Sequence, residues 1–318
     1  MEYSFITIAI FSIILFIYLH VFFHLKTSNE LELYEIELPS KDKLHEICDL
    51  KQPVMFKFDN TYLNTNLGLQ LLKSSYGSFD VNVREVDDNE GELYFQLPLN
   101  IATKLFADEK EKKYYLEKNG EFLKETRLLK HFQSVDELLR PTMVSECNYD
   151  LLIGTNNANT CLQYSLDNRN FFYVCEGSIT VKLIPPNYSK YLHTENDYTN
   201  FEFRSKINPW NVDKSYHIDY NKSHSFDVNV SQGQILFIPN YWWYSIKLHE
   251  DSNVLKFTYK TYMNHISIIP QLCLSFLQQS NVKRTENKSS EKIISFNEKI
   301  DISNNTISEG NDNLGSTD

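Results

Sequence analysis

The stretch SQGQILFIPNYWWYSIKL, residues 231–248, decides the fold. Residues 234–239 form an apolar run bounded by a glycine and a proline, which is typical of a buried β-strand. Gly233 stands where the chain must turn sharply before this strand. Trp242 and Trp243 are successive, so in an extended chain they point to opposite faces. We expect one of these rings in the core and the other at the mouth of a cleft.

Short runs of the same kind continue on both sides of this stretch. Turn signals separate them, and a double proline, which cannot donate to a ladder, ends one of them. Strands at this spacing indicate a sandwich or barrel and argue against a parallel sheet built from βαβ units. The runs are DLLIG (150–154), TCLQYSL (160–166), NFFYVCEGSITVKLIPP (170–186), SFDVNV (225–230) and VLKFTYKTY (254–262).

The first half of the chain mixes helical and extended patterns. Apolar residues alternate with polar ones in residues 79–86, which predicts a half-buried strand. A further strand is expected at 53–58. Helices are expected at 41–50, at 63–74, at 99–139 with an interruption at Asn119-Gly120, and at 263–279 with a bend at Pro270.

Residues 3–25 carry no charged side chain and are rich in Ile, Leu, Phe and Val. As a helix this run spans roughly 34 Å, enough for a bilayer core of about 30 Å. A cleaved signal peptide is the alternative, but Glu2 replaces its basic n-region and no small-residue cleavage site follows. We therefore predict a single-pass membrane protein. Lys26, Lys41 and Lys43 place its soluble domain in the cytosol.

Composition excludes one class of partner. A net charge of −11 argues against nucleic-acid binding. Five cysteines without a C-x-x-C pair suggest neither a zinc ribbon nor a disulfide framework.

We expect an anchor at 1–27, an α/β region at 28–140, a β-rich core with a C-terminal helix at 141–280, and a disordered polar tail at 281–318.

The β-rich half resembles the cupin-like hydroxylases, the JmjC-related branch that includes the asparaginyl hydroxylase acting on hypoxia-inducible factor. The likeness rests on three blocks: residues 152–177, VKLIPP at 181–186, and residues 231–248 with their I-P-x-x-W-W run. The Asn- and Lys-rich composition also resembles that of giant-virus proteins. The resemblance implies a mainly β fold with α, a double-stranded β-helix or cupin-like jelly roll, preceded by the membrane helix and the α/β region.

Active members of that family bind Fe(II) through an H-x-D pair on one strand and a distal His after the paired Trp. The corresponding positions here are Gln163, Ser165 and Tyr244, or Tyr164 and Leu166 for the first two if the register is set from Asn170. The basic residue expected to bind 2-oxoglutarate is replaced by Ile179. We therefore predict that the fold is kept, that the iron site is lost, and that no cofactor is bound.

Two alternatives remain open. The first is an active Fe(II)/2-oxoglutarate hydroxylase with an atypical site. Its displaced metal ligands would be His217, Asp219 and His224, which form a true H-x-D with a following His. The second is a purely structural membrane protein in which the barrel is only a scaffold. The segment around His217 is polar and rich in Ser and Asn, which favours a surface loop or an edge strand over a metal site.

Four residues are candidates for lining a pocket: Lys256, Trp242, Trp243 and Asn170. Lys256 matches a position where the resembled hydroxylase has an inward Asn. If it points inward it needs a partner or an anionic ligand, because a buried unpaired ammonium is costly. The other interpretation is an edge-strand lysine facing water. The expected partners are the membrane, through residues 3–25, a protein or peptide, and a small carboxylate.

Overall fold

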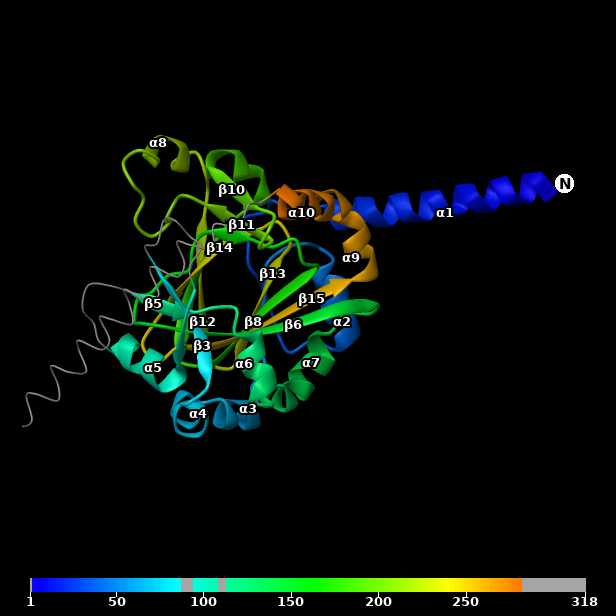
Figure 1. The fold of residues 1–318 in the computed structure, drawn as a ribbon. Helices are drawn as coiled ribbons and strands as arrows, with labels where there is room; N and C mark the ends of the chain where they lie inside the picture. Colours follow the sequence, from blue (N-terminus) through cyan, green and yellow to red (C-terminus); the bar gives the residue numbers. More distant parts are fainter. Residues whose placement is uncertain (1, 87–93, 108–112, 282–318) are drawn as a thin grey trace, which may run out of the picture.

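A computed structural model describes residues 2–86, 94–107 and 113–281. Except for Asn281, the last residue of helix α10 (Ile269–Asn281), the predicted polar tail at 281–318 lies outside these residues. Helix α1 (Glu2–Leu25) projects from a rounded body made of helices and β-sheets (Figure 1). Among the described residues it is the one helix long and apolar enough to cross a membrane.

Two six-stranded sheets form the body and confirm the jelly-roll prediction. The first has the order β1-β2-β13-β8-β15-β6 and the second the order β10-β11-β7-β14-β9-β12. The strands of the first sheet are β1 (Tyr34–Ile36), β2 (Val54–Lys57), β6 (Val144–Ile153), β8 (Arg169–Glu176), β13 (Gln234–Pro239) and β15 (Asn253–Thr261). Those of the second are β7 (Gln163–Tyr164), β9 (Ser178–Ile184), β10 (Thr194–Asp197), β11 (Glu202–Ser205), β12 (Phe226–Ser231) and β14 (Trp243–Leu248).

A small third sheet stands beside them, with the order β4-β3-β5. It consists of β3 (Asp80–Glu85), β4 (Phe95–Pro98) and β5 (Tyr114–Leu116). The helices and 3₁₀ turns of the body are α2 (Lys41–Cys48), α3 (Thr61–Asn66), α4 (Leu69–Tyr76), α5 (Leu99–Ala107), α6 (Gly120–Glu125), η1 (Leu128–Phe132), α7 (Gln133–Leu139), η2 (Pro186–Tyr191), α8 (His217–Tyr220), α9 (Tyr262–Ser267) and α10 (Ile269–Asn281).

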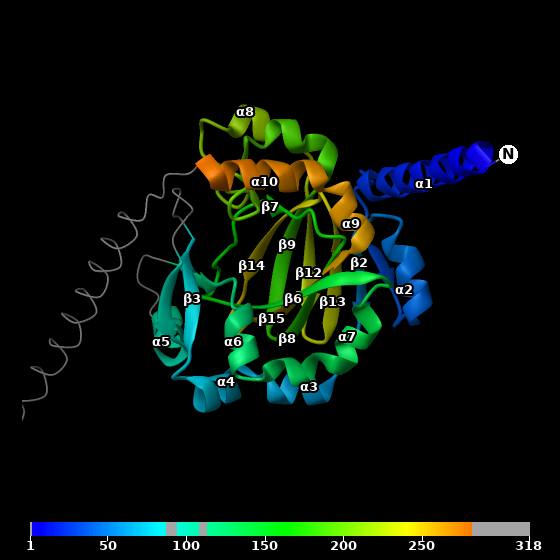
Figure 2. The same cartoon turned by 45° about the vertical axis from the view of Figure 1, so that its right-hand side comes forward.

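The strand parity of the first sheet divides the core in two. On β8, Phe171 and Tyr173 face a cluster shared with helices α2 to α7, while Phe172 and Val174 face a second cluster between the two large sheets. Helices α3, α4, α6 and α7 contribute buried residues to the first cluster, and Figure 2 shows them along the lower side of the body. The interior between the sheets, where a jelly roll holds its ligands, is therefore lined by alternate residues of β8, β14 and β15.

Three predicted elements were wrong in detail. Tyr114–Leu116 is a strand inside the predicted helix 99–139, because its aromatic residues pair with β3. The predicted helix 63–74 is two helices, broken at Leu67-Gly68. The segment around His217 forms a single helical turn, α8, where a loop or an edge strand was expected.

Candidate functional site

Two of the three positions that correspond to iron ligands lie next to each other. Strand β14 pairs with β7, and Tyr244 stands directly opposite Gln163. Tyr244 is buried in the cluster between the two large sheets, together with Ile246 and Leu248 of the same strand. The jelly roll therefore brings these side chains into its interior, as the family's site would require.

The Tyr244 hydroxyl meets an ammonium group. Lys256 Nζ donates to Tyr244 Oη at 3.4 Å, and the ring of Tyr244 packs edge-on against Phe172 with centroids 5.4 Å apart. Burial raises the pKa of Tyr244 above its ordinary value. The phenol therefore stays protonated at neutral pH and can donate a hydrogen bond of its own.

Lys256 points into the body, so the interpretation as an edge-strand lysine is wrong. Strand β15 lies between β8 and β6, and Lys256 is paired with Phe172 on one side and Asp150 on the other. Burial alone would lower the pKa of Lys256, but the oxygens of Tyr244, Glu117 and Asp150 raise it above its ordinary value. A protonated ammonium is thus held among carboxylates inside the fold.

Glu117, just after β5, joins the interior to the small sheet. Gln163 Nε2 donates to Glu117 Oε1 at 3.4 Å, and Arg84 of β3 forms an ion pair with Glu117 at 3.1 Å. The side chains of Arg84 and Glu117 are only 5% and 12% exposed. Burial would raise the pKa of Glu117, but Arg84 and Lys256 lower it below its ordinary value. The carboxylate is therefore ionised and compensated by these cations.

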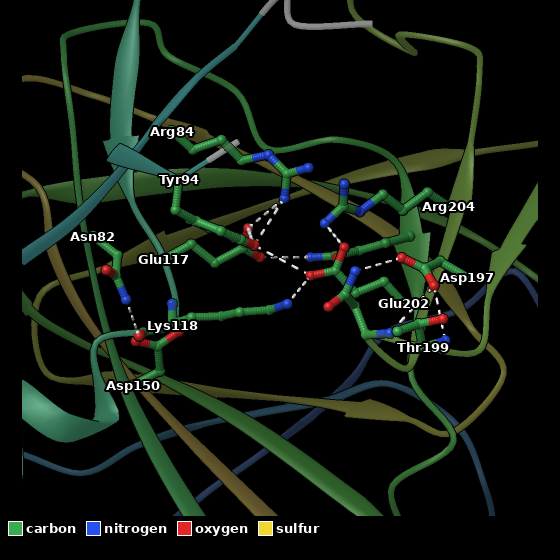
Figure 3. Close-up of polar contacts among 12 residues, drawn as sticks. Asn82, Arg84, Tyr94, Glu117, Lys118, Asp150, Asp197, Thr199, Glu202 and Arg204 are labelled. Atoms are coloured by element: carbon green, nitrogen blue, oxygen red, sulfur yellow. Dashed lines mark hydrogen bonds and ion pairs between the residues drawn. The ribbon is translucent and has the colours of Figure 1, made fainter. Parts of the chain in front are cut away.

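The ion pair extends into a wider network, shown in Figure 3. Tyr94 accepts from Arg84 Nη1 at 3.0 Å and contacts Glu117 and Glu202 at 3.2 Å each. Glu202 in turn forms ion pairs with Lys118 and Arg204. Cations and carboxylates alternate through this group, which we call the charged network: Arg84, Tyr94, Glu117, Lys118, Glu202, Arg204 and Lys256.

A cavity of about 420 Å³ opens beside the charged network. Arg84, Glu202 and Arg204 belong both to the network and to the cavity wall. Other charged side chains in the wall are Glu85, Glu195, Asp197, Lys206 and Asp213. The cavity therefore offers charges of both signs, which suit a polar ligand that carries both donors and acceptors.

The residues at the corresponding iron-ligand positions do not fit Fe(II). Ser165 Oγ is hydrogen-bonded to Asp167 Oδ2 at 2.5 Å and Gln163 donates to Glu117, so both are engaged with protein groups. A protonated phenol at Tyr244 with an ammonium beside it offers no anionic ligand for a divalent cation. Ile179 is fully buried in the apolar cluster between the sheets, so it cannot bind the carboxylate of 2-oxoglutarate.

The displaced H-x-D does not assemble a metal site. His217 Nε2 contacts the carbonyl of Val212 at 3.0 Å, whereas Asp219 contacts His193 at 3.0 Å. The ring of His224 packs against Tyr188. Over residues 2–86, 94–107 and 113–281, no group of three His, Cys, Asp or Glu side chains is arranged to hold a metal ion.

The remaining pocket candidates lie in three different places. Trp242 is in the cluster between the sheets, and its Nε1 donates to the carbonyl of Lys51 at 3.2 Å. Trp243 is also fully buried, in a small separate cluster with Leu162, and it lines a shallow cavity near Leu25 rather than the cavity beside the charged network. Asn170 is buried on β8 and accepts from Thr258 Oγ1 at 3.4 Å.

The sequence did not reveal that the first half of the chain supplies Arg84 and Glu117 to the site. Arg84 lies in a strand that was predicted to be half-buried. A charged side chain in such a strand indicates that an oppositely charged partner lies nearby. Its partner Glu117 fell within a predicted helix, which hid the pairing.

Comparison with known proteins agrees with this geometry. The family model described as a cupin-like domain matches residues 64–263. HSPB1-associated protein 1 from Homo sapiens is 30% identical over 98 residues, which are 30% of this chain and 20% of the relative. The same protein from Bos taurus matches to the same extent. The matched segment thus spans about a fifth of these curated relatives.

Proposed function

The chain belongs to the cupin-like domain family, and from this premise we propose that it is a membrane-anchored binding protein without iron chemistry. One observation carries the proposal: the ammonium of the half-buried Lys256 points inward, and its Nζ stands 3.4 Å from the oxygen of Tyr244, the residue at the distal ligand position. Two unit charges about 4 Å apart repel by about 4 kcal/mol at an effective dielectric of 20, and a dication repels more strongly. Lys256 thus supplies a positive charge where the family's site would hold a metal.

Metal analysis of the purified protein tests this absence of iron. We expect far less than one iron per chain, also after anaerobic incubation with Fe(II), and no consumption of 2-oxoglutarate coupled to oxygen use. Stoichiometric iron that is lost in a His217→Ala variant would contradict the proposal and favour the displaced site instead.

The ligand that we propose for the cavity is a segment of another protein. The wall carries charges of both signs, which suits the mixed side chains and amides of a peptide better than a small dianion. Arg84 is already paired with Glu117, and the carboxylates of Glu117 and Asp150 lie near enough to Lys256 to raise its pKa, which argues against a free carboxylate ligand. The relatives' name, which records association with HSPB1, also supports a protein partner.

Site-specific photo-crosslinking separates these ligands. A photoreactive amino acid replaces Lys206, an exposed residue of the cavity wall, and in a control chain it replaces Leu71 on α4. We expect a protein adduct from position 206 that position 71 does not give. An unchanged melting temperature in millimolar succinate or 2-oxoglutarate is also expected, and a clear rise would favour the small acid.

A further inference from the structure

Helix α10 turns its apolar side outward. Ile269, Leu272 and Phe276 share one face of the helix and are 50%, 38% and 72% exposed. The polar side faces the body, where Gln278 Oε1 accepts from the backbone N–H of Tyr198 at 3.1 Å. A helix on a water-facing surface has the opposite arrangement, with its apolar stripe toward the core.

Charged residues are absent from this helix. The sequence IPQLCLSFLQQSN contains no Asp, Glu, Lys or Arg. Surfaces that contact water are normally rich in charge, and a contiguous exposed apolar patch marks an interaction site. The outward face of α10 is therefore suited to an apolar environment.

The position of α10 indicates which environment this is. Helix α9, which leads into α10, packs against α1, and Leu25 and Gln271 line one shallow cavity. Figures 1 and 2 show α9 and the start of α10 on the side of the body from which α1 leaves. Asn240 Nδ2 donates to the carbonyl of His24 at 3.1 Å, so the end of α1 is fixed to the body without a flexible stalk.

We propose that the outward face of α10 is seated in the lipid headgroup layer beside α1, as a second membrane contact. This inference rests on the membrane anchoring proposed above. Because α1 is apolar up to Leu25, groups beside Leu25 lie at the level of the headgroups, a layer of about 5–8 Å on each side of the hydrocarbon core. Tyr262, 58% exposed at the start of α9, is an aromatic residue suited to that layer.

Tryptophan fluorescence of the full chain in phosphatidylcholine vesicles tests the contact. Phe276→Trp places a probe on the outward face of α10, and the parent chain measures the emission of the three native tryptophans. We expect the emission that this tryptophan adds to be blue-shifted and to be quenched by lipids brominated close to the headgroup. Leu71→Trp, on α4 far from α1, is the matched control and should add red-shifted emission that these lipids do not quench (Figure 2).

A third variant distinguishes the proposed membrane contact of α10 from the membrane anchoring by α1. Phe16→Trp reports on the middle of α1 and should be quenched by lipids brominated deep in the acyl chain. If Phe16→Trp is not quenched, the anchoring proposal fails. If it is quenched but Phe276→Trp behaves like Leu71→Trp, the face is in water and only the second contact is wrong. Blue-shifted emission without quenching means that protein, a second copy or the chain's own tail, covers α10, which also overturns the proposal.

Discussion

At the scale of single residues, the interior of this jelly roll holds a network of charges beside the positions that correspond to the iron ligands of the resembled family. Lys256 supplies the cation, while Glu117 and Asp150 supply the nearby carboxylates. Breaking one partner of a buried ion pair is costly, because the remaining charge is left in a medium of low dielectric. The charged network should therefore contribute to the stability of the fold as well as to the character of the cavity.

Glu117→Gln keeps the shape of the side chain and removes its charge. Arg84 and Lys256 then lack their shared counter-ion, so we expect the free energy of unfolding at pH 7 to fall by about 3 kcal/mol. Chemical denaturation measures this change. Glu121→Gln, the same substitution on the exposed face of α6, is the control and should change stability by less than about 0.5 kcal/mol. Equal effects of the two substitutions would show that the buried ion pair is unimportant.

The same pair predicts a pH dependence. The pKa of Glu117 is lowered below its ordinary value of 4.5, so the folded state favours the ionised form. Its stabilisation is fully present above pH 4.5 and is lost as the pH falls through the lower, folded-state pKa. We expect the stability difference between the wild-type chain and Glu117→Gln to shrink as the pH is lowered from neutral through this range. A difference that stays constant with pH would contradict the assignment.

Restoring the iron ligands should require removal of the ammonium. The variant Gln163→His, Ser165→Asp, Tyr244→His recreates the family's ligand types but leaves Lys256 next to the metal position. We expect no visible Co(II) absorption from this variant, and absorption once Lys256→Gln is added, because the repulsion of the cation is removed. Co(II) binding by the triple variant alone would show that Lys256 does not exclude a metal.

The sequence located part of this arrangement. The I-P-x-x-W-W run places Tyr244 in register, and strand pairing then brings it opposite Gln163. The pairing of Arg84 with Glu117 joins residues 33 positions apart through a sheet that local patterns do not reveal. Glu117 could be identified as the partner of Arg84 only after residues 114–116 were known to form strand β5.

At the scale of elements, the small sheet shows how tertiary context overrides a local pattern. Strand β5 has three residues within a charged, helix-like stretch, but all three are buried and pair with β3. Asn119 prolongs this pairing beyond the strand: its Oδ1 accepts from Asn82 N at 2.7 Å and its Nδ2 donates to Asn82 O at 3.1 Å. One buried amide thus replaces a strand residue and satisfies both backbone groups.

Asn119→Ala should therefore destabilise the fold. It leaves the N–H and C=O of Asn82 without these partners, and we expect a loss of about 2 kcal/mol in the free energy of unfolding. Asn119→Asp keeps the acceptor and loses the donor, so its effect should be intermediate unless its buried charge adds to the loss. Asn100→Ala, on the exposed side of α5, is the control. An Asn119→Ala variant as stable as the control would show that these two hydrogen bonds do not contribute to stability.

The long alternating strands were predictable and the short ones were not. Residues 79–86 and 225–230 show the period-2 pattern, and both contain strands, β3 and β12. The four-residue strands β10 and β11 form a hairpin whose residues are mostly polar or exposed, so no apolar period marks them. These strands carry Glu202 and Arg204, which is why this part of the cavity wall could not be predicted.

At the scale of the whole molecule, the junction of α1 with the body fixes how the body is oriented relative to this helix. Lys26 N donates to the carbonyl of Phe22 at 3.1 Å, so the helical pattern continues to the edge of the body. The contact between Asn240 and His24 then fixes the body directly against the end of the helix. If α1 spans a bilayer, as proposed, the cavity lies at a constant distance from it.

The side of the membrane that the body occupies can be tested through its sequons. Asn187-Tyr188-Ser189 is a glycosylation sequon, and Asn187 is exposed. A cytosolic body, as the lysines after the anchor predict, should remain unglycosylated when the chain is expressed in eukaryotic cells. The mass of the protein before and after treatment with a glycosidase measures this. A shift to lower mass that Asn187→Gln abolishes would place the body in the lumen.

Removing residues 1–27 should release a folded body from the integral membrane fraction. Among the described residues, none of the buried side chains in the two main core clusters comes from this segment, so the fold loses only the packing of α1 against α9 and the hydrogen bond to His24. High-pH carbonate detaches proteins held only by surface contacts, and we expect the shortened chain in its supernatant.

At neutral pH a fraction of the shortened chain should still sediment with vesicles through α10, because an apolar face that enters the headgroup layer binds reversibly. Phe276→Ser should reduce that fraction, whereas Leu71→Ser should not. Sedimentation that persists in carbonate would mean that a second segment crosses the bilayer.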